Sequence, residues 1–153
     1  MARLLVDAMC GRLARYLRFC GHDTVYAPDR DLEADDALAA VADREGRTLI
    51  TRDRSLAAEA EAAILLTERD IDDQLAAVQA AGISLTMPEH PERCGRCNGR
   101  LRRRSPSATD IEYVPDDFDG PTFVCVRCGQ IFWRGSHWDR VAARLASVRG
   151  DND

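Results

Sequence analysis

Four of the six cysteines form two Cys-x-x-Cys pairs, a pattern that is typical of metal-binding knuckles. Cys94 pairs with Cys97 and Cys125 with Cys128, and 27 residues separate the two pairs. Four thiolates at this spacing can surround one ion tetrahedrally, and zinc is the ion that zinc ribbons hold in this way. A site with four protein ligands has no open coordination position, so this zinc is expected to stabilise the fold rather than to catalyse a reaction.

Two other interpretations of these cysteines compete with zinc. The same knuckle suits rubredoxin-type iron, which would make the chain an electron carrier. Two disulfides are the other possibility, but Met1 leads directly into an apolar run without a secretory signal. We therefore expect a cytoplasmic protein with reduced thiols. Cys10 and Cys20 lie outside the quartet, and we expect both to be small buried hydrophobic side chains.

Acidic side chains could supply the chemistry that a closed zinc site cannot. Asp7 and Asp53 follow two predicted strands, and Asp35 and Asp36 stand in the first turn of a predicted helix. In an open parallel sheet, the carboxyl ends of the strands and the starts of the crossover helices share one edge, where ligands bind. Carboxylates that converge there need a cation, and Mg²⁺ or Mn²⁺ prefers oxygen ligands. Such ions activate water for attack on a phosphodiester.

Each of these carboxylates also has a structural explanation. Asp35 and Asp36 are typical of a helix N-terminus, where they cap the helix and oppose its dipole. Asp53 could cap a helix that begins near Ser55, and Asp7 could hydrogen-bond to a turn. The arrival of three acidic elements at one sheet edge favours catalysis. The sequence contains none of the common phosphate-binding, dinucleotide-binding, zinc-protease or serine-hydrolase motifs that would offer another chemistry.

The elements that must position these residues alternate in hydrophobic period. Short apolar runs predict strands at 3–7, 24–26, 48–51 and 63–66. Helical spacing of apolar residues lies between them, and glycines 21, 46 and 82 mark helix ends. Strands separated by helices predict an α/β fold with a mainly parallel sheet and right-handed crossovers. Ser136 is expected to cap a last helix, whose apolar face comprises Trp138, Val141, Ala142, Leu145 and Val148.

The chain of 153 residues is long enough for one α/β domain and a small metal-stabilised module. We place the domain at 1–86, a proline-containing linker at 87–92, and the zinc ribbon with its C-terminal helix at 93–153. No apolar run is long enough to cross a membrane. The net charge is −5, with −7 in residues 1–90 and +2 in residues 91–153. This asymmetry fits a cation site beside an anion-binding surface.

Arginines near the knuckles form the best candidate surface for nucleic acid. Six of them lie within residues 93–104, namely Arg93, Arg96, Arg100, Arg102, Arg103 and Arg104. Arg12, Arg15 and Arg18 are expected on the exposed face of the first helix, where they could hold a phosphate backbone or simply be solvated. His137 could contact RNA or dock the two domains. Phe123, Phe132 and Trp133 are expected in the ribbon core, with base stacking as the lesser alternative.

The sequence resembles the Mut7-C RNase family, a PIN-like domain with a C-terminal zinc ribbon, over nearly its whole length. The segments that carry this resemblance are 5–18, 21–24, 35–38, 47–53, 74–75, the two knuckles and 133–138. The resemblance implies a metal-dependent ribonuclease whose acidic set is Asp7, Asp35, Asp36 and Asp53. PIN-like domains often present a fourth acidic position, for which Asp70, Asp72 and Asp73 are candidates.

Two hypotheses about function follow from these residues. In the first, Mg²⁺ or Mn²⁺ at the acidic edge hydrolyses RNA, and the zinc ribbon assists RNA binding. In the second, the chain is a catalytically inactive PIN-like module that binds RNA, a ribosome or a protein partner through the ribbon. Cleavage that depends on Asp7 and Asp53 would favour the first. RNA binding that needs Arg102, Arg103 and Arg104 but no divalent ion would favour the second.

Overall fold

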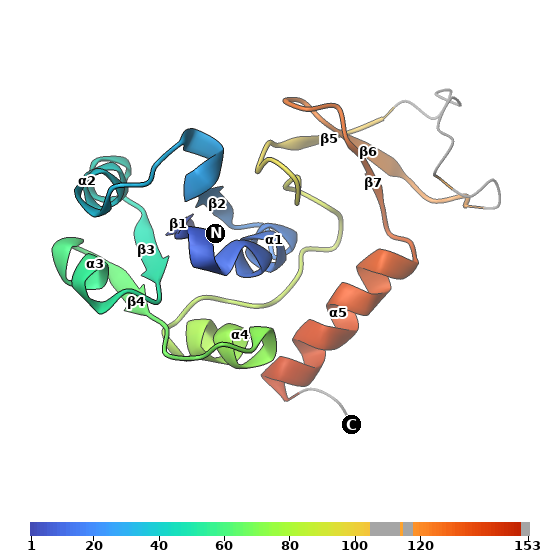
Figure 1. Ribbon diagram of the computed structural model, residues 1–153. Coiled ribbons are helices and arrows are strands. Elements are labelled where there is room, and N and C mark those ends of the chain that lie inside the picture. Colours follow the sequence, from blue (N-terminus) through green and yellow to red (C-terminus); the bar gives the residue numbers. More distant parts are fainter. Residues whose placement is uncertain (105–113, 115–117, 151–153) are drawn as a thin grey trace.

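The computed structural model describes residues 1–104, 114 and 118–150 (Figure 1). Its strands are β1 (Arg3–Val6), β2 (Asp23–Tyr26), β3 (Thr48–Thr51), β4 (Ala63–Leu65), β5 (Leu101–Arg103), β6 (Thr122–Cys125) and β7 (Ile131–Trp133). Its α-helices are α1 (Gly11–Phe19), α2 (Asp35–Glu45), α3 (Arg54–Glu59), α4 (Ile71–Ala80) and α5 (Ser136–Arg149). Two short 3₁₀ helices follow the first two strands, η1 (Ala8–Cys10) and η2 (Ala27–Arg30).

The first four strands form one parallel sheet in the order β2-β1-β3-β4. Leu5 of β1 is in register with Val25 on one side and with Leu49 on the other, so β1 is an inner strand. The chain moves outward from β1 to β2 and then returns to the other side of β1. The point where the strand order reverses therefore lies between β1 and β3, the place where open α/β sheets bind ligands. The predicted α/β fold is confirmed.

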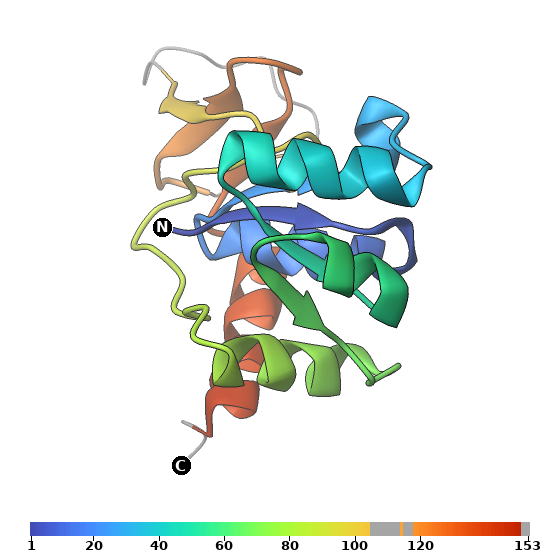
Figure 2. The same cartoon turned by 90° about the vertical axis from the view of Figure 1, so that its left-hand side faces the viewer.

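Helices cover both faces of this sheet because side chains along each strand alternate in direction. Leu4, Val6 and Ile50 pack in one core with α1, α4 and α5. Leu5 and Leu49 point to the other face and pack with α2 and α3. Figures 1 and 2 show these two helical layers with the sheet between them. Cys10 and Cys20 are buried in the first core, which confirms that they are small hydrophobic side chains.

The last helix, α5, packs against the parallel sheet domain although it follows the ribbon in sequence (Figure 1). Its buried residues Trp138, Val141 and Leu145 belong to the same core as the residues of α1 and α4. Helices α4 and α5 lie side by side, and Arg144 of α5 forms an ion pair with Asp72 of α4 at 2.7 Å. The proposed division into 1–86, 87–92 and 93–153 stays a prediction. Helix α5, which that division assigns to the ribbon segment, packs in the core of the first segment.

The ribbon is a second, antiparallel sheet in the order β5-β6-β7. Arg93 and Arg100 form an additional antiparallel bridge beside the first knuckle. The ribbon lies above α1 in Figure 1, and the segment from α4 to β5 passes below α1 and then beside it to reach the ribbon. Within the described residues, no helix is both long and apolar enough to span a membrane.

The predicted boundaries agree closely with the structure, and two local details differ. Strand β3 is Thr48–Thr51 as expected, and β1, β2 and β4 differ from prediction by one residue. Gly135 rather than Ser136 is the N-cap of α5, and neither gives a side-chain cap. The two 3₁₀ helices were not predicted, because each is only one turn long and has no apolar periodicity of its own.

Candidate functional site

The four cysteine side chains converge on one point in the ribbon. All four Sγ atoms lie within 4.8 Å of one another, with 3.7 Å between Cys94 and Cys128 and 3.5 Å between Cys97 and Cys125. Four thiolates around a tetrahedral zinc are about 3.8 Å apart, given a Zn–S distance of about 2.3 Å. These separations fit a metal ion, and all six cysteines are free thiols. The disulfide alternative is therefore wrong, and the quartet fits a zinc ribbon.

Backbone geometry explains why each knuckle presents its thiols inward. The residue after each second cysteine adopts the left-handed conformation, with φ of 71° at Asn98 and 79° at Gly129. Their N–H groups donate to the carbonyls of Cys94 (2.9 Å) and Cys125 (3.0 Å) and close the two turns. Gly99 is also required, because a Cβ there would lie 2.6 Å from the Cys125 Sγ. Asn98, not Gly99, is thus the counterpart of Gly129.

The thiols differ in how readily they lose a proton. Burial raises the pKa of Cys94 to about 12, so this thiol needs a bound metal to be deprotonated. Burial acts in the same direction on Cys125, but the N–H groups of Cys128 and Arg127 point at its sulfur and lower its pKa to about 7. Cys125 is therefore more acidic than Cys94.

The first knuckle docks on the parallel sheet through Asn98. Its Oδ1 accepts from the N–H of Thr24 at 2.9 Å, and its Nδ2 donates to Asp23 Oδ1 at 2.8 Å. Thr24 belongs to β2, an edge strand, so the amide replaces part of a missing strand partner. Arg18 of α1 adds to this contact by donating to the carbonyls of Thr24 (2.9 Å) and Gly95 (3.1 Å). We call the contact of Asn98 and Arg18 with Asp23, Thr24 and Gly95 the joint between ribbon and sheet.

Asp23 sits at the centre of a buried polar cluster under this joint. Arg47, which directly precedes β3, donates to Asp23 Oδ1 at 3.0 Å and to Glu45 Oε1 at 2.8 Å. Burial opposes ionisation of Asp23, yet hydrogen bonds from Asn98 and Arg47 hold its pKa below the ordinary value of 3.8. The cluster lies at the amino ends of the strands, away from the predicted acidic edge. Its role is to hold the ribbon on the sheet.

Asp7 and Asp53 lie at the carboxyl ends of the adjacent strands β1 and β3 and share a partner, Thr51. The hydroxyl of Thr51 donates to Asp7 Oδ2 at 2.8 Å and accepts from the Asp53 N–H at 3.0 Å. Asp7 Oδ1 also accepts from the N–H of Ala8 at 2.7 Å. The sequence placed both acids at this edge but gave no indication of the bridging hydroxyl.

Asp53 caps helix α3, which confirms the expectation that it could cap a helix beginning near Ser55. Its Oδ1 accepts from the N–H groups of Ser55 (2.9 Å) and Leu56 (3.3 Å). Its Oδ2 accepts no hydrogen bond from another described residue. One oxygen thus fixes the helix, while the other stays available to a cation at the point where the strand order reverses. Capping and metal binding are compatible at this residue.

Asp35 and Asp36 stand exposed in the first turn of α2, as predicted. Asp36 Oδ1 accepts from the N–H of Ala37 at 3.0 Å. Across the described residues, the cysteine quartet is the one group of three or more potential ligands whose atoms lie within 4.8 Å of each other. Within that part of the chain, Asp35 and Asp36 thus do not form such a group with Asp7 and Asp53. The acidic metal site therefore stays a prediction.

The candidates for a fourth acidic position surround the start of α4. Asp70 is its N-cap residue, and Asp72 and Asp73 occupy its first turn. Asp72 is engaged with Arg144 across the helix interface, which gives it a structural role. All three are exposed. Asp70 and Asp73 form no ion pair with Arg144 and are therefore the better candidates for the fourth acidic position.

Two further side chains at the acidic edge were not singled out from the sequence. Tyr26 ends β2 and donates its hydroxyl to the carbonyl of Ala8 at 2.8 Å. A Cβ at Gly11 would lie 2.8 Å from that hydroxyl, so the start of α1 needs a glycine there. Arg52, between Thr51 and Asp53, has a buried Nε with no hydrogen-bond partner among the described residues. A donor that is buried in this way is shielded from a substrate, so it gives Arg52 no role as a phosphate ligand.

The basic residues of α1 divide into two exposed and one buried. Arg12 and Arg15 are exposed, as expected for an RNA-facing surface. Arg18 is only 4% exposed and forms an ion pair with Asp29 at 3.5 Å as well as the hydrogen bonds to the joint. The prediction that all three share a solvated face was wrong for Arg18. Its guanidinium satisfies backbone carbonyls that would otherwise be buried without partners.

The ribbon arginines are mostly exposed. Arg96 donates to Gln130 Oε1 at 3.4 Å, while Arg100, Arg102 and Arg103 are exposed around β5. Arg93 instead turns inward, where it donates to the Asn98 carbonyl at 3.1 Å. Arg104 and His137, the remaining predicted RNA ligands, are half-buried and exposed respectively. Their binding to RNA stays a prediction.

A family model described as Mut7-C RNAse domain matches residues 2–145, nearly the whole chain. The match includes the parallel sheet with its acidic edge and the cysteine quartet. Searches of curated proteins and of solved structures found no match. The resemblance drawn from the sequence motifs is confirmed.

Proposed function

The chain belongs to the Mut7-C RNAse domain family, and from this membership we propose that it is a metal-dependent ribonuclease. The proposed reaction is hydrolysis of RNA phosphodiester bonds at the carboxyl edge of the parallel sheet. Asp7, Asp35, Asp36 and Asp53 form the proposed acidic set. The observation that carries the proposal is the shared hydroxyl of Thr51, which holds Asp7 and Asp53 together at the reversal point of the sheet.

The donor set suits Mg²⁺ or Mn²⁺. Both oxygens of Asp7 accept one hydrogen bond each and retain lone pairs, and Asp53 Oδ2 has no described donor. Mg²⁺ is often bound by one or two carboxylates and keeps several waters, so Asp35 and Asp36 can act through such waters. When bound, the ion activates water and stabilises charge on the phosphate.

The chain's own residues supply positioning. Thr51 orients the Asp7 carboxylate, and the α3 cap fixes the side chain of Asp53. The exposed Arg12 can pair with the phosphate backbone, and the zinc ribbon would bind further phosphates through Arg100, Arg102 and Arg103. Each group acts by holding the substrate in line with the acidic edge.

The competing function is an inactive module that binds RNA, a ribosome or a protein partner through the ribbon. Within the described residues, Asp35 and Asp36 belong to no compact group of potential ligands, which favours it. A cleavage assay with Mn²⁺ on total RNA separates the two, with wild type run beside Asp53→Asn. Cleavage by wild type alone supports the nuclease. RNA binding without cleavage supports the module.

A further inference from the structure

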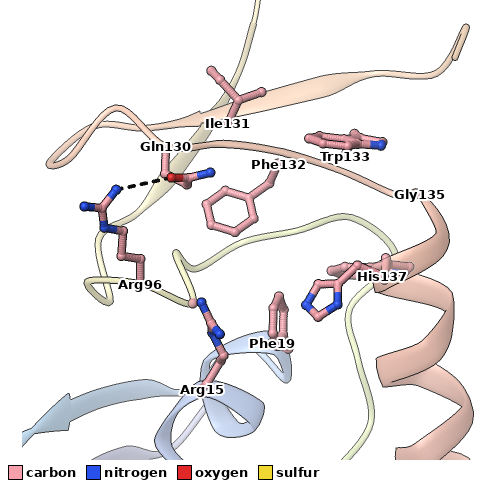
Figure 3. A pocket seen from close by; sticks show the side chains of 11 residues that line it. Arg15, Phe19, Arg96, Gln130, Ile131, Phe132, Trp133, Gly135 and His137 are labelled. Atoms are coloured by element: carbon pink, nitrogen blue, oxygen red, sulfur yellow. Dashed lines mark hydrogen bonds between the residues drawn. The ribbon is translucent and has the colours of Figure 1, made fainter. Parts of the chain in front are cut away.

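A cavity of about 250 Å³ lies between the ribbon and α1, away from the acidic edge (Figure 3). Three separate segments line it: α1, the first knuckle, and the stretch that runs from the residue before β7 to the start of α5. The lining residues are Arg15, Phe19, Gly95, Arg96, Gln130, Ile131, Phe132, Trp133, Gly135, His137 and Trp138. Neither of the two proposed functions assigns a role to this cavity. Its walls combine aromatic rings with arginines.

One wall of the cavity is a rigid aromatic cluster. The ring of Phe19 meets the ring of His137 at a centroid distance of 5.6 Å and that of Trp138 at 6.4 Å, both edge to face. Phe19 and Trp138 are each only 7% exposed, because they also belong to the core under α5. This wall is therefore fixed before any ligand arrives.

The opposite wall consists of the partly buried Phe132 and the glycine of the first knuckle. Phe132 extends from β7 toward Arg15 and Phe19 (Figure 3) and is only partly buried. Gly95 lies beside Phe19, and a Cβ there would approach the Phe19 ring to 3.2 Å. The glycine thus keeps the cavity open next to the knuckle. A flat ligand between Phe132 and the Phe19 wall would have aromatic surface on both sides.

Two cations stand at the cavity. Arg15 is exposed and makes no hydrogen bond or ion pair with another described residue. Arg96 is exposed and donates a 3.4 Å hydrogen bond to Gln130. Flat apolar surface beside two available guanidinium groups complements a base attached to a phosphate. Burial, with Arg140 and Arg15 nearby, lowers the pKa of His137, so its ring is uncharged at neutral pH and can donate and accept.

We propose that this cavity binds an unpaired base of single-stranded RNA, stacked on Phe132 beside the wall that Phe19 forms, with Arg15 and Arg96 on its phosphates. The proposal rests on the ribonuclease function above and names its substrate as RNA with unpaired bases. Helix α1 connects the two sites: it begins four residues after Asp7, and Arg12, Arg15 and Phe19 follow one face at helical spacing. From Arg12 to Phe19 the helix rises about 10 Å. A strand along this face would reach both the acids and the cavity.

Tryptophan fluorescence measures occupancy directly, because the only two tryptophans, Trp133 and Trp138, both line the cavity. Zinc-loaded wild type would be titrated with AMP and UMP, which contain no internucleotide bond to cleave, and with ribose 5-phosphate. Saturable quenching by the nucleotides but not by ribose 5-phosphate is expected. Absence of quenching, or equal response to ribose 5-phosphate, would overturn the proposal in favour of an empty or merely phosphate-binding cavity.

Phe132→Leu tests the stacking, and Phe118→Leu is its matched control. Loss of the Phe132 ring should weaken nucleotide binding about tenfold or more. Phe118 is also half-buried but does not line the cavity, so its replacement should leave binding unchanged. Zinc content verifies that both variants keep the ribbon. Equal affinity in all three proteins would contradict the assignment.

A last comparison separates this proposal from the nuclease assignment. Asp53→Asn protein would be titrated with a short single-stranded oligoribonucleotide and with the same strand in a duplex. Quenching by the single strand alone supports the base pocket whether or not wild type cleaves RNA. Cleavage by wild type, with no quenching by either form and no effect of Phe132→Leu, would support the nuclease assignment and contradict the proposal that the cavity binds a base.

Discussion

Thr51 donates its hydroxyl proton to Asp7 over 2.8 Å, although the two residues are 44 positions apart in the chain. The same hydroxyl accepts from the N–H of Asp53. Strands β1 and β3 bring these groups together because they are neighbours in the sheet. Thr51 is fully buried, so its hydroxyl has a fixed place between the two acids. This shared hydroxyl makes the acidic edge a single structural unit.

Thr51→Val should impair cleavage without removing any acid. Valine keeps the shape of threonine but leaves the Oδ2 atom of Asp7 without its donor, and a hydrogen bond to a charged group is worth about 1.5–3 kcal/mol. We expect kcat/KM for RNA to fall roughly tenfold and Thr51→Ser to restore most of it. Thr48→Val, at the other end of β3, is the control. Equal rates for Thr51→Val and wild type would remove Thr51 from the site.

Removal of one ribbon cysteine should abolish stoichiometric zinc binding. Cys128 is exposed, so Cys128→Ala disturbs packing least while it deletes one of four thiolates. We expect about one zinc per chain in wild type and in Cys20→Ala, whose sulfur lies in the helical core, and much less in Cys128→Ala. Metal analysis of the purified proteins checks this. Full zinc content in Cys128→Ala, or iron in wild type, would contradict the zinc ribbon.

Acid should weaken the joint between ribbon and sheet through Asp23. Its pKa is lowered in the folded protein, so its ionised form favours folding. The contribution is complete above the ordinary pKa of 3.8 and is lost as pH falls through the lower folded value. Asp23→Asn should cost about 1–3 kcal/mol at pH 7, since Arg47 keeps Glu45 as a partner. The difference from wild type should shrink toward pH 3.

Urea unfolding at both pH values measures this effect. Asp31→Asn is the control, because Asp31 is exposed and its left-handed backbone, with φ of 55°, suits asparagine equally well. An Asp23→Asn protein that stays as stable as wild type at pH 7 would show that the cluster does not support the joint.

The exposed ribbon arginines should contribute to RNA affinity in a salt-dependent way. In the Asp53→Asn background, which separates binding from cleavage, Arg102→Gln with Arg103→Gln should weaken binding of single-stranded RNA. The logarithm of the RNA affinity falls linearly with the logarithm of the salt concentration. The magnitude of this slope should decrease by about 0.7 for each phosphate contact that the double substitution removes. Arg44→Gln, an exposed arginine of α2 outside the ribbon, should leave the slope unchanged. An unaltered slope in the double variant would place the RNA elsewhere.

Local periodicity was enough to predict the parallel sheet and the positions of Asp7 and Asp53. Each strand is a short apolar run, and each acid closely follows one, so the sheet edge could be derived without tertiary information. The cysteine spacing likewise predicted the quartet. The position of α5 could not be derived in the same way. Its apolar stripe predicted a buried face but not that this face would complete the core with α1 and α4.

Interactions between distant segments were the part that the sequence concealed. Asn98 looks like an ordinary knuckle residue, yet it pairs with Thr24 and Asp23, more than 70 residues away. Arg18 has the spacing of a solvated helix face but is buried because the ribbon lies over α1. The cavity beside Phe132 has the same origin, since three separate segments enclose it. Such features depend on the docking of two modules.

Mn²⁺-dependent cleavage of total RNA by wild type and Asp53→Asn tests the central claim most directly. Asparagine caps a helix as well as aspartate does, so α3 should stay intact while the negative charge is removed. We predict cleavage by wild type and a loss of at least about a hundredfold in Asp53→Asn, with equal zinc content and equal unfolding midpoints. Undiminished cleavage by Asp53→Asn would contradict the assignment of the acidic edge as the active site.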